Sequence, residues 1–399
     1  MGNELSFEQS ASILNAIASQ ATGTAQITPL NTAQFVSLAQ TTLKTGYDNV
    51  IGAISQVLSR TIFGIRPYTR KLAGLNASAQ RYGNHIRKIN YVDDAFVDDV
   101  GVGNAAVGGG IVDGQSIDQY TIRTPKVIQT NFYGINAVED YVTILRDQLD
   151  TAFSSAEEFG RFISGVMTNM SNKHEQMHEN TARLTLANAI GAKAKADTGN
   201  VIHLLTEYNA ATGLTLDNQT VYQPENFKAF MQWAYARIGT LSSLLTERSI
   251  KYHMNFTGKP IQRHTPKNLQ KVYLHAPARY QTEAMVLADT YHDSYLRFAD
   301  VETVNFWQSI ETPDSIKVWP CYVGADGAVV ETPTSGDPVT VNNIFGVIFD
   351  EEAAGYTTIN TSLDPSPYNA RGRYYNLWYR FHDRWWLDLT ENFVVLLLD

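Results

Sequence analysis

The chain has 399 residues, of which 44% are hydrophobic and 18% are charged, and its formal net charge is −9. This composition excludes an intrinsically disordered chain, and the length suffices for one large domain or two to three modest ones. The negative charge argues against a broad, nonspecific grip on nucleic acid, which requires clustered Lys and Arg.

The N-terminal residues 1–30 are rich in Ala, Ser, Thr and Gln, which predicts a loosely ordered arm with one short helix around Phe7–Ala18. Residues 31–65 then place apolar side chains at helical spacing, and Asn31 or Thr32 is suited to cap this helix. The acidic N-terminus has no apolar run and therefore predicts no secretory signal.

Two β-rich segments follow, at 83–101 and 116–142, and the glycine-rich stretch 101–115 joins them. Their turn residues and β-branched composition predict a long two-stranded hairpin with a glycine-rich tip. An isolated two-stranded ribbon is marginally stable in water. We therefore expect this hairpin to lie against another part of the structure, most simply a neighbouring subunit.

Residues 154–196 carry the longest helical pattern of the chain. Either Ser154 with Glu157, or Ser155 with Glu158, is spaced as a capping box at its start. An apolar stripe follows, formed by Phe159, Phe162, Ile163, Val166, Met167 and Met170, and we expect it to continue through residues 174–178 to Leu184. The pattern predicts a helix of about 40 residues and about 60 Å, far longer than the usual globular helix.

The rest of the chain alternates between helical and strand patterns. Residues 199–223 suggest a strand or loop connector, 225–247 an amphipathic helix, and 272–275 a strand before a helix at 277–288. Residues 375–399 are aromatic, strand-like and apolar at their end. No internal repeat or long linker interrupts the chain, so the pattern predicts an α+β assembly.

The sequence HEQMH, from His174 to His178, matches the H-E-x-x-H motif of helical zinc proteases, with Glu175 as general base. Such a site needs a third protein ligand. The extended motif fails because Thr181 stands where glycine is required, and Glu207 is the nearest downstream glutamate after the helix. We interpret the histidines as part of a packed or intersubunit helix face, with a zinc metallopeptidase as the alternative.

Two further patterns lie near the expected hairpin tip. Residues 101–106 match a loose G-x-G-x-x-A fingerprint, but no buried strand precedes them and no helix follows, so we expect no nucleotide cofactor. The carboxylates Asp93, Asp94, Asp98 and Asp99 predict a solvated acidic face, with a bound Ca²⁺ or Mg²⁺ left open. No serine elbow or phosphate-binding loop is present, so we predict no catalytic residue and no resident metal.

The order of arm, long hairpin, very long helix, mixed α/β region and terminal strand resembles the HK97-fold major capsid protein of tailed double-stranded DNA bacteriophages, and phi29-like capsids are similar in plan. The resemblance lies in architecture and size, not in a short motif. It implies five regions: an N-terminal arm and helix at 1–79, an E-loop at 80–135, a peripheral (P) domain at 136–264 with its spine helix at 154–197, an axial (A) domain at 265–348, and C-terminal strands returning to the P domain at 349–399.

The resemblance implies a self-assembling virion shell protein without enzymatic activity, made in the bacterial host cytoplasm. Its subunits would form hexamers and pentamers around double-stranded DNA that they bind without sequence specificity. The portal and scaffolding or decoration proteins would be further partners, and no membrane is involved. We expect intersubunit contacts at Asp98, Asp99, Gly101, Gly103, Gly108, Gly109, Gly110, His174 and His178.

Two questions stay open at this point. Some capsid proteins of this fold crosslink a lysine to an asparagine, and Lys88 and Lys126 lie in the expected E-loop. No matching motif supports that chemistry here. Another structural phage protein, such as a portal or tail component, is a second alternative to the capsid protein.

Overall fold

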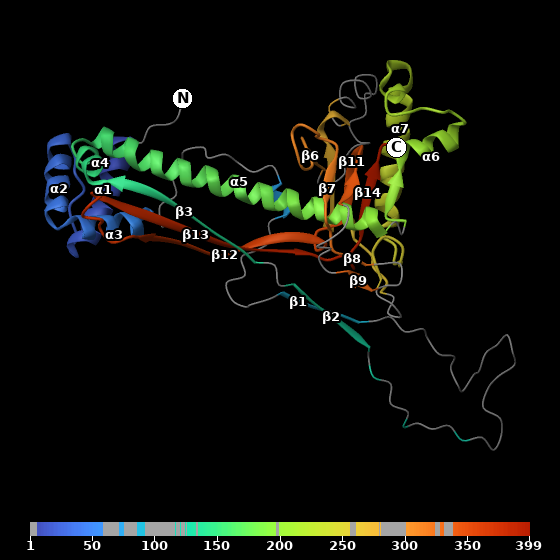
Figure 1. Cartoon of the computed structure of the whole chain (residues 1–399), viewed down its shortest axis with the longest axis horizontal. Helices are drawn as coiled ribbons and strands as arrows, with labels where there is room; N and C mark the ends of the chain where they lie inside the picture. Colours follow the sequence, from blue (N-terminus) through green and yellow to red (C-terminus); the bar gives the residue numbers. More distant parts are fainter. Residues whose placement is uncertain are drawn as a thin grey trace. The chain divides into compact units, whose positions relative to one another are not determined.

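The computed structural model describes residues 6–58, 72–75, 86–91, 126–132, 135–196, 199–255, 261–278, 301–323, 328–330 and 338–399, with the single positions 116, 120, 124 and 280. The chain folds into two compact units, and most of their elements are labelled in Figure 1. The first unit comprises Met1–Asn84, Tyr133–Thr185 and Gly355–Trp386, and the second comprises His85–Phe132, Leu186–Ala354 and Leu387–Asp399. Both contain helices and strands, which confirms the predicted α+β class.

The first helix of the first unit is longer than predicted. Helix α1 (Phe7–Thr22) begins at a capping box in which the Ser6 side chain accepts a hydrogen bond from the backbone N–H of Gln9. It ends at Gly23, whose φ of 70° closes the last turn in the left-handed conformation that glycine adopts without strain.

The single helix predicted from residue 31 is wrong, because the chain forms two helices there, α2 (Thr32–Lys44) and α3 (Tyr47–Leu58). Gly46 separates them with a φ of 106°, which a helix does not accommodate. The predicted cap is confirmed: the Asn31 side chain accepts from the N–H of Gln34 at 2.9 Å.

A three-stranded sheet completes the first unit, in the order β12 (Ala354–Pro365), β13 (Tyr374–Leu387) and β3 (Ile135–Leu145). Strand β13 runs antiparallel to β3. Alternate residues of β13 are buried from Tyr375 to Asp383, namely Tyr375, Leu377, Tyr379, Phe381 and Asp383, and Arg384 is buried as well. The inner side of this sheet packs with α1–α3, α4 (Arg146–Ala152) and the start of the long helix in one apolar core.

The predicted long helix is confirmed as α5 (Ala156–Ala196), whose 41 residues span about 60 Å. Ser155 caps it, because its hydroxyl accepts from the N–H of Glu158 at 3.2 Å. The predicted continuation of the apolar stripe to Leu184 is wrong, since 55% of that residue is exposed. The residues buried in this turn are instead Ala182, Arg183, Thr185 and Leu186.

A five-stranded sheet forms the centre of the second unit. Its order is β4 (Val201–His203), β14 (Phe393–Leu397), β11 (Ile344–Asp350), β5 (Gln270–His275) and β6 (Val301–Val304). Every residue of β11 and β14 is buried, which explains why both strands are almost continuously apolar in sequence. The strands predicted at 272–275 and at the C-terminus are thereby confirmed.

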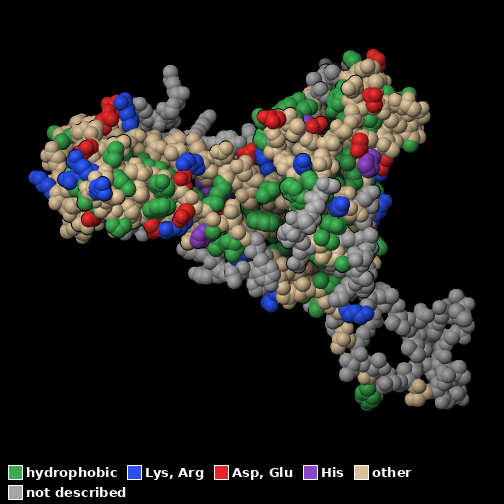
Figure 2. Space-filling view, viewed as in Figure 1, with side chains coloured by type: hydrophobic (Ala, Val, Ile, Leu, Met, Phe, Trp, Pro, Cys, Tyr) green, Lys and Arg blue, Asp and Glu red, His purple; other side chains and the backbone are tan. Residues whose placement is uncertain are grey.

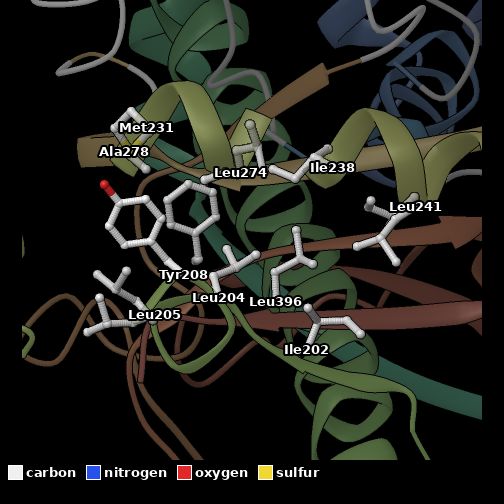
Figure 3. Packing of buried hydrophobic residues seen from close by; sticks show 14 of the residues in the cluster. Ile202, Leu204, Leu205, Tyr208, Met231, Ile238, Leu241, Leu274, Ala278 and Leu396 are labelled. Atoms are coloured by element: carbon white, nitrogen blue, oxygen red, sulfur yellow. The ribbon is translucent and has the colours of Figure 1, made fainter. Parts of the chain in front are cut away.

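Helices α6 (Leu204–Thr212) and α7 (Pro224–Leu244) share one buried apolar core with this sheet (Figure 3). The prediction of a connector without a helix at 199–223 is wrong, because α6 lies within it. Helix α6 is only nine residues long, too short for a clear period. The core of Figure 3 includes Leu204, Leu205, Tyr208, Met231, Ile238, Leu241, Leu274 and Leu396.

Short elements complete the described chain. They are η1 (Ala73–Leu75), η2 (Thr220–Tyr222), η3 (Lys267–Leu269) and the strand pairs β7 (Ile316–Val318) with β10 (Val339–Val341) and β8 (Tyr322–Val323) with β9 (Val329–Val330). The helix predicted at 277–288 lies almost entirely outside the described residues.

Candidate functional site

The base of the predicted hairpin is formed by two strands of the second unit. Strand β1 (Ile86–Tyr91) pairs antiparallel with β2 (Val127–Phe132). The tip lies outside the described residues, together with Asp93, Asp94, Asp98, Asp99, Gly101, Gly103, Gly108, Gly109 and Gly110. The role of these residues in intersubunit contacts therefore stays a prediction.

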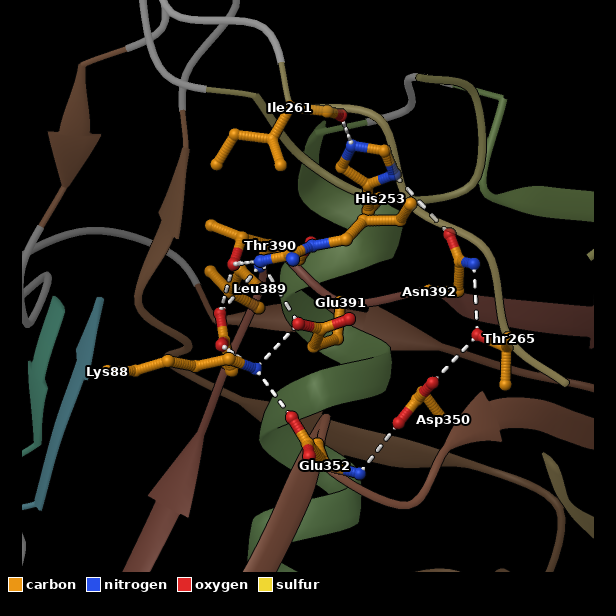
Figure 4. Close-up of polar contacts among 12 residues, drawn as sticks. Lys88, His253, Ile261, Thr265, Asp350, Glu352, Leu389, Thr390, Glu391 and Asn392 are labelled. Atoms are coloured by element: carbon orange, nitrogen blue, oxygen red, sulfur yellow. Dashed lines mark hydrogen bonds and ion pairs between the residues drawn. The ribbon is translucent and has the colours of Figure 1, made fainter. Parts of the chain in front are cut away.

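Residues 388–392 form the turn that joins β13 to β14 (the 388–392 turn). Lys88 of β1 connects the hairpin base to this turn. Its Nζ lies 2.5 Å from Oε1 of Glu391, 3.1 Å from Oδ2 of Asp388 and 3.1 Å from Oε2 of Glu352 (Figure 4). The side chains of Asp388 and Glu391 are only 1% and 8% exposed, whereas that of Glu352 is 67% exposed. The hairpin is thus held by an ammonium group set among buried carboxylates, where pairing is needed to offset desolvation.

Two more cations reach the same turn. Arg263 lies with its Nη2 3.0 Å from Oε1 of Glu391, and its Nε donates to the carbonyl oxygen of Thr390 at 3.1 Å. Lys193 of α5 is 1% exposed and donates from Nζ to the carbonyl oxygen of Leu389 at 3.1 Å. We call Lys88, Lys193, Arg263, Asp388 and Glu391 the anchor cluster.

Hydrogen bonds hold the 388–392 turn in shape. The Asp388 carboxylate accepts from the backbone N–H of Thr390 at 2.9 Å and from its hydroxyl at 2.6 Å. Asn392 donates from Nδ2 to the hydroxyl of Thr265 at 3.0 Å, and that hydroxyl donates to the carboxylate of Asp350 at 2.8 Å (Figure 4). The acids of the anchor cluster are therefore presented by a rigid loop.

The anchor cluster perturbs the pKa values of its members in different directions. Burial lowers the pKa of Lys88, but Asp388 and Glu391 outweigh it, so the net pKa is raised and the ammonium stays charged. Burial lowers the pKa of Lys193 to about 7, although the same two acids oppose this shift. Burial also raises the pKa of Glu391, against the opposing effects of Lys88 and Arg263. Lys193 is therefore the cation of this cluster whose charge changes near neutral pH.

Sequence reasoning did not predict the anchor cluster. The sequence suggested Lys88 only as a crosslinking candidate, and it predicted no role for the segment DLTEN of residues 388–392. One signal was available: two acids, Asp388 and Glu391, stand directly before the apolar strand that ends the chain. Acids beside a buried strand require partners, although the sequence does not say which cations supply them.

The HEQMH motif occupies a packed face of α5 in the first unit. The rings of His174 and His178 lie with centroids 4.0 Å apart, and His174 stacks on Phe381 of β13 at 4.0 Å. Nε2 of His178 lies 3.0 Å from Oδ2 of Asp383, and these residues are 2% and 0% exposed. The interpretation of a packed face is thus confirmed, while contact of the two histidines with another subunit stays a prediction.

The carboxylate beside the histidines is not the one that the sequence suggested. Glu207, the nearest downstream glutamate, accepts two hydrogen bonds from Arg237, at 2.7 and 3.1 Å. Asp383 instead joins His174 and His178 in the one group of three potential metal-ligating side chains found among the described residues. Asp383 lies on β13, far from the helix in sequence, so the spacing of residues around HEQMH could not predict it.

Comparison with solved structures identifies the fold. The capsid structure of Staphylococcus phage Andhra matches with a TM-score of 0.55 and 11% identity, over 85% of this chain and 87% of that chain. The structure of head fiber and inner core protein gp22 of native bacteriophage P68 matches with a TM-score of 0.54 and 10% identity, over the same shares. The fold is that of the HK97-like phage capsid proteins, as predicted. A search of curated proteins found no match.

The family follows from the sequence itself. A family model for the Phi29-like phage major capsid protein matches residues 14–397. The chain therefore belongs to the Phi29-like phage major capsid protein family, and it is a shell-forming component of the virion. No helix in the described part of the chain is long and apolar enough to cross a membrane.

Proposed function

We propose that this chain assembles into hexamers and pentamers of an icosahedral shell that encloses double-stranded DNA. The match of the capsid family model to residues 14–397 is the observation that carries the proposal. Assembly takes place in the cytoplasm of the bacterial host, with the portal and scaffolding or decoration proteins as partners. The protein acts by binding its own copies and performs no catalytic step.

The net charge of −9 supports enclosure of DNA without sequence-specific binding. A strongly basic inner surface would hold the packaged polymer, whereas an acidic protein lets it move during packaging and release. On the face drawn in Figure 2, the acidic and basic side chains of the described residues are interspersed. This mixture supports recognition through many local contacts between subunits.

The proposed division of labour follows the regions implied by the fold. Residues 1–79 form the N-terminal region that carries α1, α2 and α3, 80–135 the E-loop, 136–264 the P domain, 265–348 the A domain, and 349–399 the returning strands. The E-loop lies on a neighbouring subunit and buries there the apolar side chains that a free ribbon exposes. Its tip residues contribute contacts between subunits, and of the two HEQMH histidines only the half-buried His174 can add to them, because His178 is 2% exposed.

The anchor cluster supports a specific role for Lys88 in this assembly. An E-loop can bind a neighbour only if its base leaves its own subunit in a fixed direction. The contacts of Lys88 with Asp388 and Glu391 fix the strand β1 at that base. A preorganised hairpin loses less conformational entropy when it docks than a free one.

Electron microscopy of purified protein tests the proposal. Negative-stain images of the wild type should contain closed icosahedral shells, whereas rings of about twelve subunits or tubes would indicate a portal or tail component instead. Deletion of residues 98–118 should leave a soluble subunit that forms no stable shells. Normal shells from this deletion would contradict the proposed role of the tip.

The variant Lys88→Ala tests the anchor separately. We expect it to lower the yield of shells by roughly tenfold, because a mobile hairpin docks less often in the correct direction. The matched control is Arg87→Ala, which removes the neighbouring exposed cation of the same strand. Equal yields from the two variants would overturn the anchoring role while leaving the shell function intact.

A further inference from the structure

Three metal-ligating side chains converge inside the first unit. His174 and His178 stand one helical turn apart on α5 and so share a face. Asp383 approaches them from β13, and the candidate ligand atoms of the three side chains all lie within 4.8 Å of one another. Zn²⁺ bound tetrahedrally at about 2.0–2.1 Å holds its ligand atoms about 3.4 Å apart. Small side-chain rotations therefore bring the three ligand atoms onto one ion.

The surroundings hold these ligands in place. The ring of His174 stacks on Phe381 with an interplanar angle of 17°, and the ring of Tyr356 meets His178 edge-on at 5.2 Å. Asp383 belongs to a strand whose antiparallel pairing with β3 extends from Tyr374 to Arg384. Binding of an ion would therefore order few additional groups, which is the condition for tight binding by a small site.

The ligand types select the ion. Two imidazole nitrogens and one carboxylate oxygen suit Zn²⁺ and neighbouring divalent transition metals, whereas Ca²⁺ and Mg²⁺ prefer oxygen ligands throughout. Three protein ligands leave a fourth position for water. His178 and Asp383 are almost completely buried, so a polypeptide substrate has no access to them. The geometry fits a structural ion and does not fit a peptidase centre.

We propose that His174, His178 and Asp383 bind one divalent transition-metal ion, with Zn²⁺ as its representative, which braces helix α5 against strand β13. The ion would replace the contact of His178 with Asp383 by three metal–ligand bonds. Because metal binds the folded ligands and not the separated ones, it would stabilise the first unit against unfolding. The site uses the HEQMH histidines for mechanical strength in a shell protein.

Metal titration of the full chain tests the site. Wild-type protein stripped with a chelator and dialysed should bind one Zn²⁺ per chain, measured by atomic emission. Free Zn²⁺ at a hundred times the dissociation constant should raise the midpoint of thermal unfolding by about 5 °C. Co²⁺ should produce the intense visible absorption of a four-coordinate site. A wild type that binds no stoichiometric Zn²⁺ and shows no shift in the midpoint would overturn the proposal.

Single variants separate this site from adventitious binding. His174→Gln changes a half-buried ligand, and Asp383→Asn changes a buried one; both should lose the bound ion and the Co²⁺ absorption. The controls His382→Gln and His203→Gln should keep both, because His382 lies on the other side of β13 and His203 belongs to an exposed pair with Asp399. Retention of zinc by His174→Gln and its loss from His203→Gln would assign the ion to the surface pair instead.

Discussion

Two buried polar clusters in the described part of this capsid protein hold their carboxylates in different ways. In the anchor cluster of the second unit, Asp388 and Glu391 face the fixed charges of Lys88 and Arg263. In the first unit, Asp383 faces the imidazole of His178. Charged ammonium and guanidinium groups only donate hydrogen bonds, whereas a neutral imidazole also has a nitrogen lone pair that can bind metal. The first cluster is therefore suited to anchoring the hairpin, and the second is suited to receiving an ion.

The largest expected effect comes from removing an acid of the anchor cluster. Asp388→Ala leaves Lys88 and Lys193 with one buried carboxylate fewer and removes the acceptor of both hydrogen bonds that Thr390 donates. We expect the free energy of unfolding of the unassembled subunit to fall by about 3–5 kcal/mol, because breaking a buried ion pair leaves the remaining charge with less compensation for its desolvation. Chemical denaturation followed by circular dichroism measures this change.

An exposed ion pair supplies the control for this variant. Asp364 pairs with Arg380 at 2.8 Å, but its side chain is 54% exposed. Asp364→Ala should change the free energy of unfolding by less than about 1 kcal/mol, since solvent screens such pairs. A loss in Asp388→Ala no greater than in Asp364→Ala would mean that the anchor cluster does not stabilise the fold.

A smaller effect concerns the pH dependence of stability. The pKa of Lys193 falls from 10.5 to about 7 on folding, so the unfolded chain binds more protons between these values. The contribution of Lys193 to the free energy of unfolding therefore increases with pH, by about 2 kcal/mol between pH 7 and pH 9. Lys193→Met should abolish this gain, and denaturation curves at the two pH values measure it.

The neighbouring lysine tests whether burial causes this dependence. Lys195 lies two residues further along α5 and is exposed. Lys195→Met should leave the gain between pH 7 and pH 9 unchanged. If Lys193→Met and Lys195→Met both keep it, another group is responsible and Lys193 is charged throughout this range.

The sequence predicted those parts of the fold that local periodicity determines. Helix α5 follows from its apolar stripe and from the Ser155 cap, and the strand β14 follows from a continuous apolar run at 393–398. Local patterns failed where a single backbone conformation decides the outcome. Gly46 interrupts a pattern that continues across it, and so divides one predicted helix into two.

The candidate sites were less predictable because their partners are distant in sequence. HEQMH correctly placed His174 and His178 on one face, but nothing near it indicated Asp383. Lys88 likewise meets its partner Glu391 from a strand some 300 positions earlier. Tertiary pairing of this kind depends on how the sheets assemble, and side-chain spacing along one element does not contain that information.

The smallest expected effect tests whether burial decides how much each acid around Lys88 contributes to stability. Glu352 and Asp388 each lie 3.1 Å from Nζ of Lys88, yet their side chains are 67% and 1% exposed. Glu352→Gln should therefore lower the free energy of unfolding by less than about 1 kcal/mol, because water replaces the lost charge. The same denaturation measurement compares it with Asp388→Ala. If the two variants were equally destabilised, the contribution of each acid to stability would depend on its distance from Lys88 and not on its burial. The exposed carboxylate of Glu352 would then also anchor the hairpin.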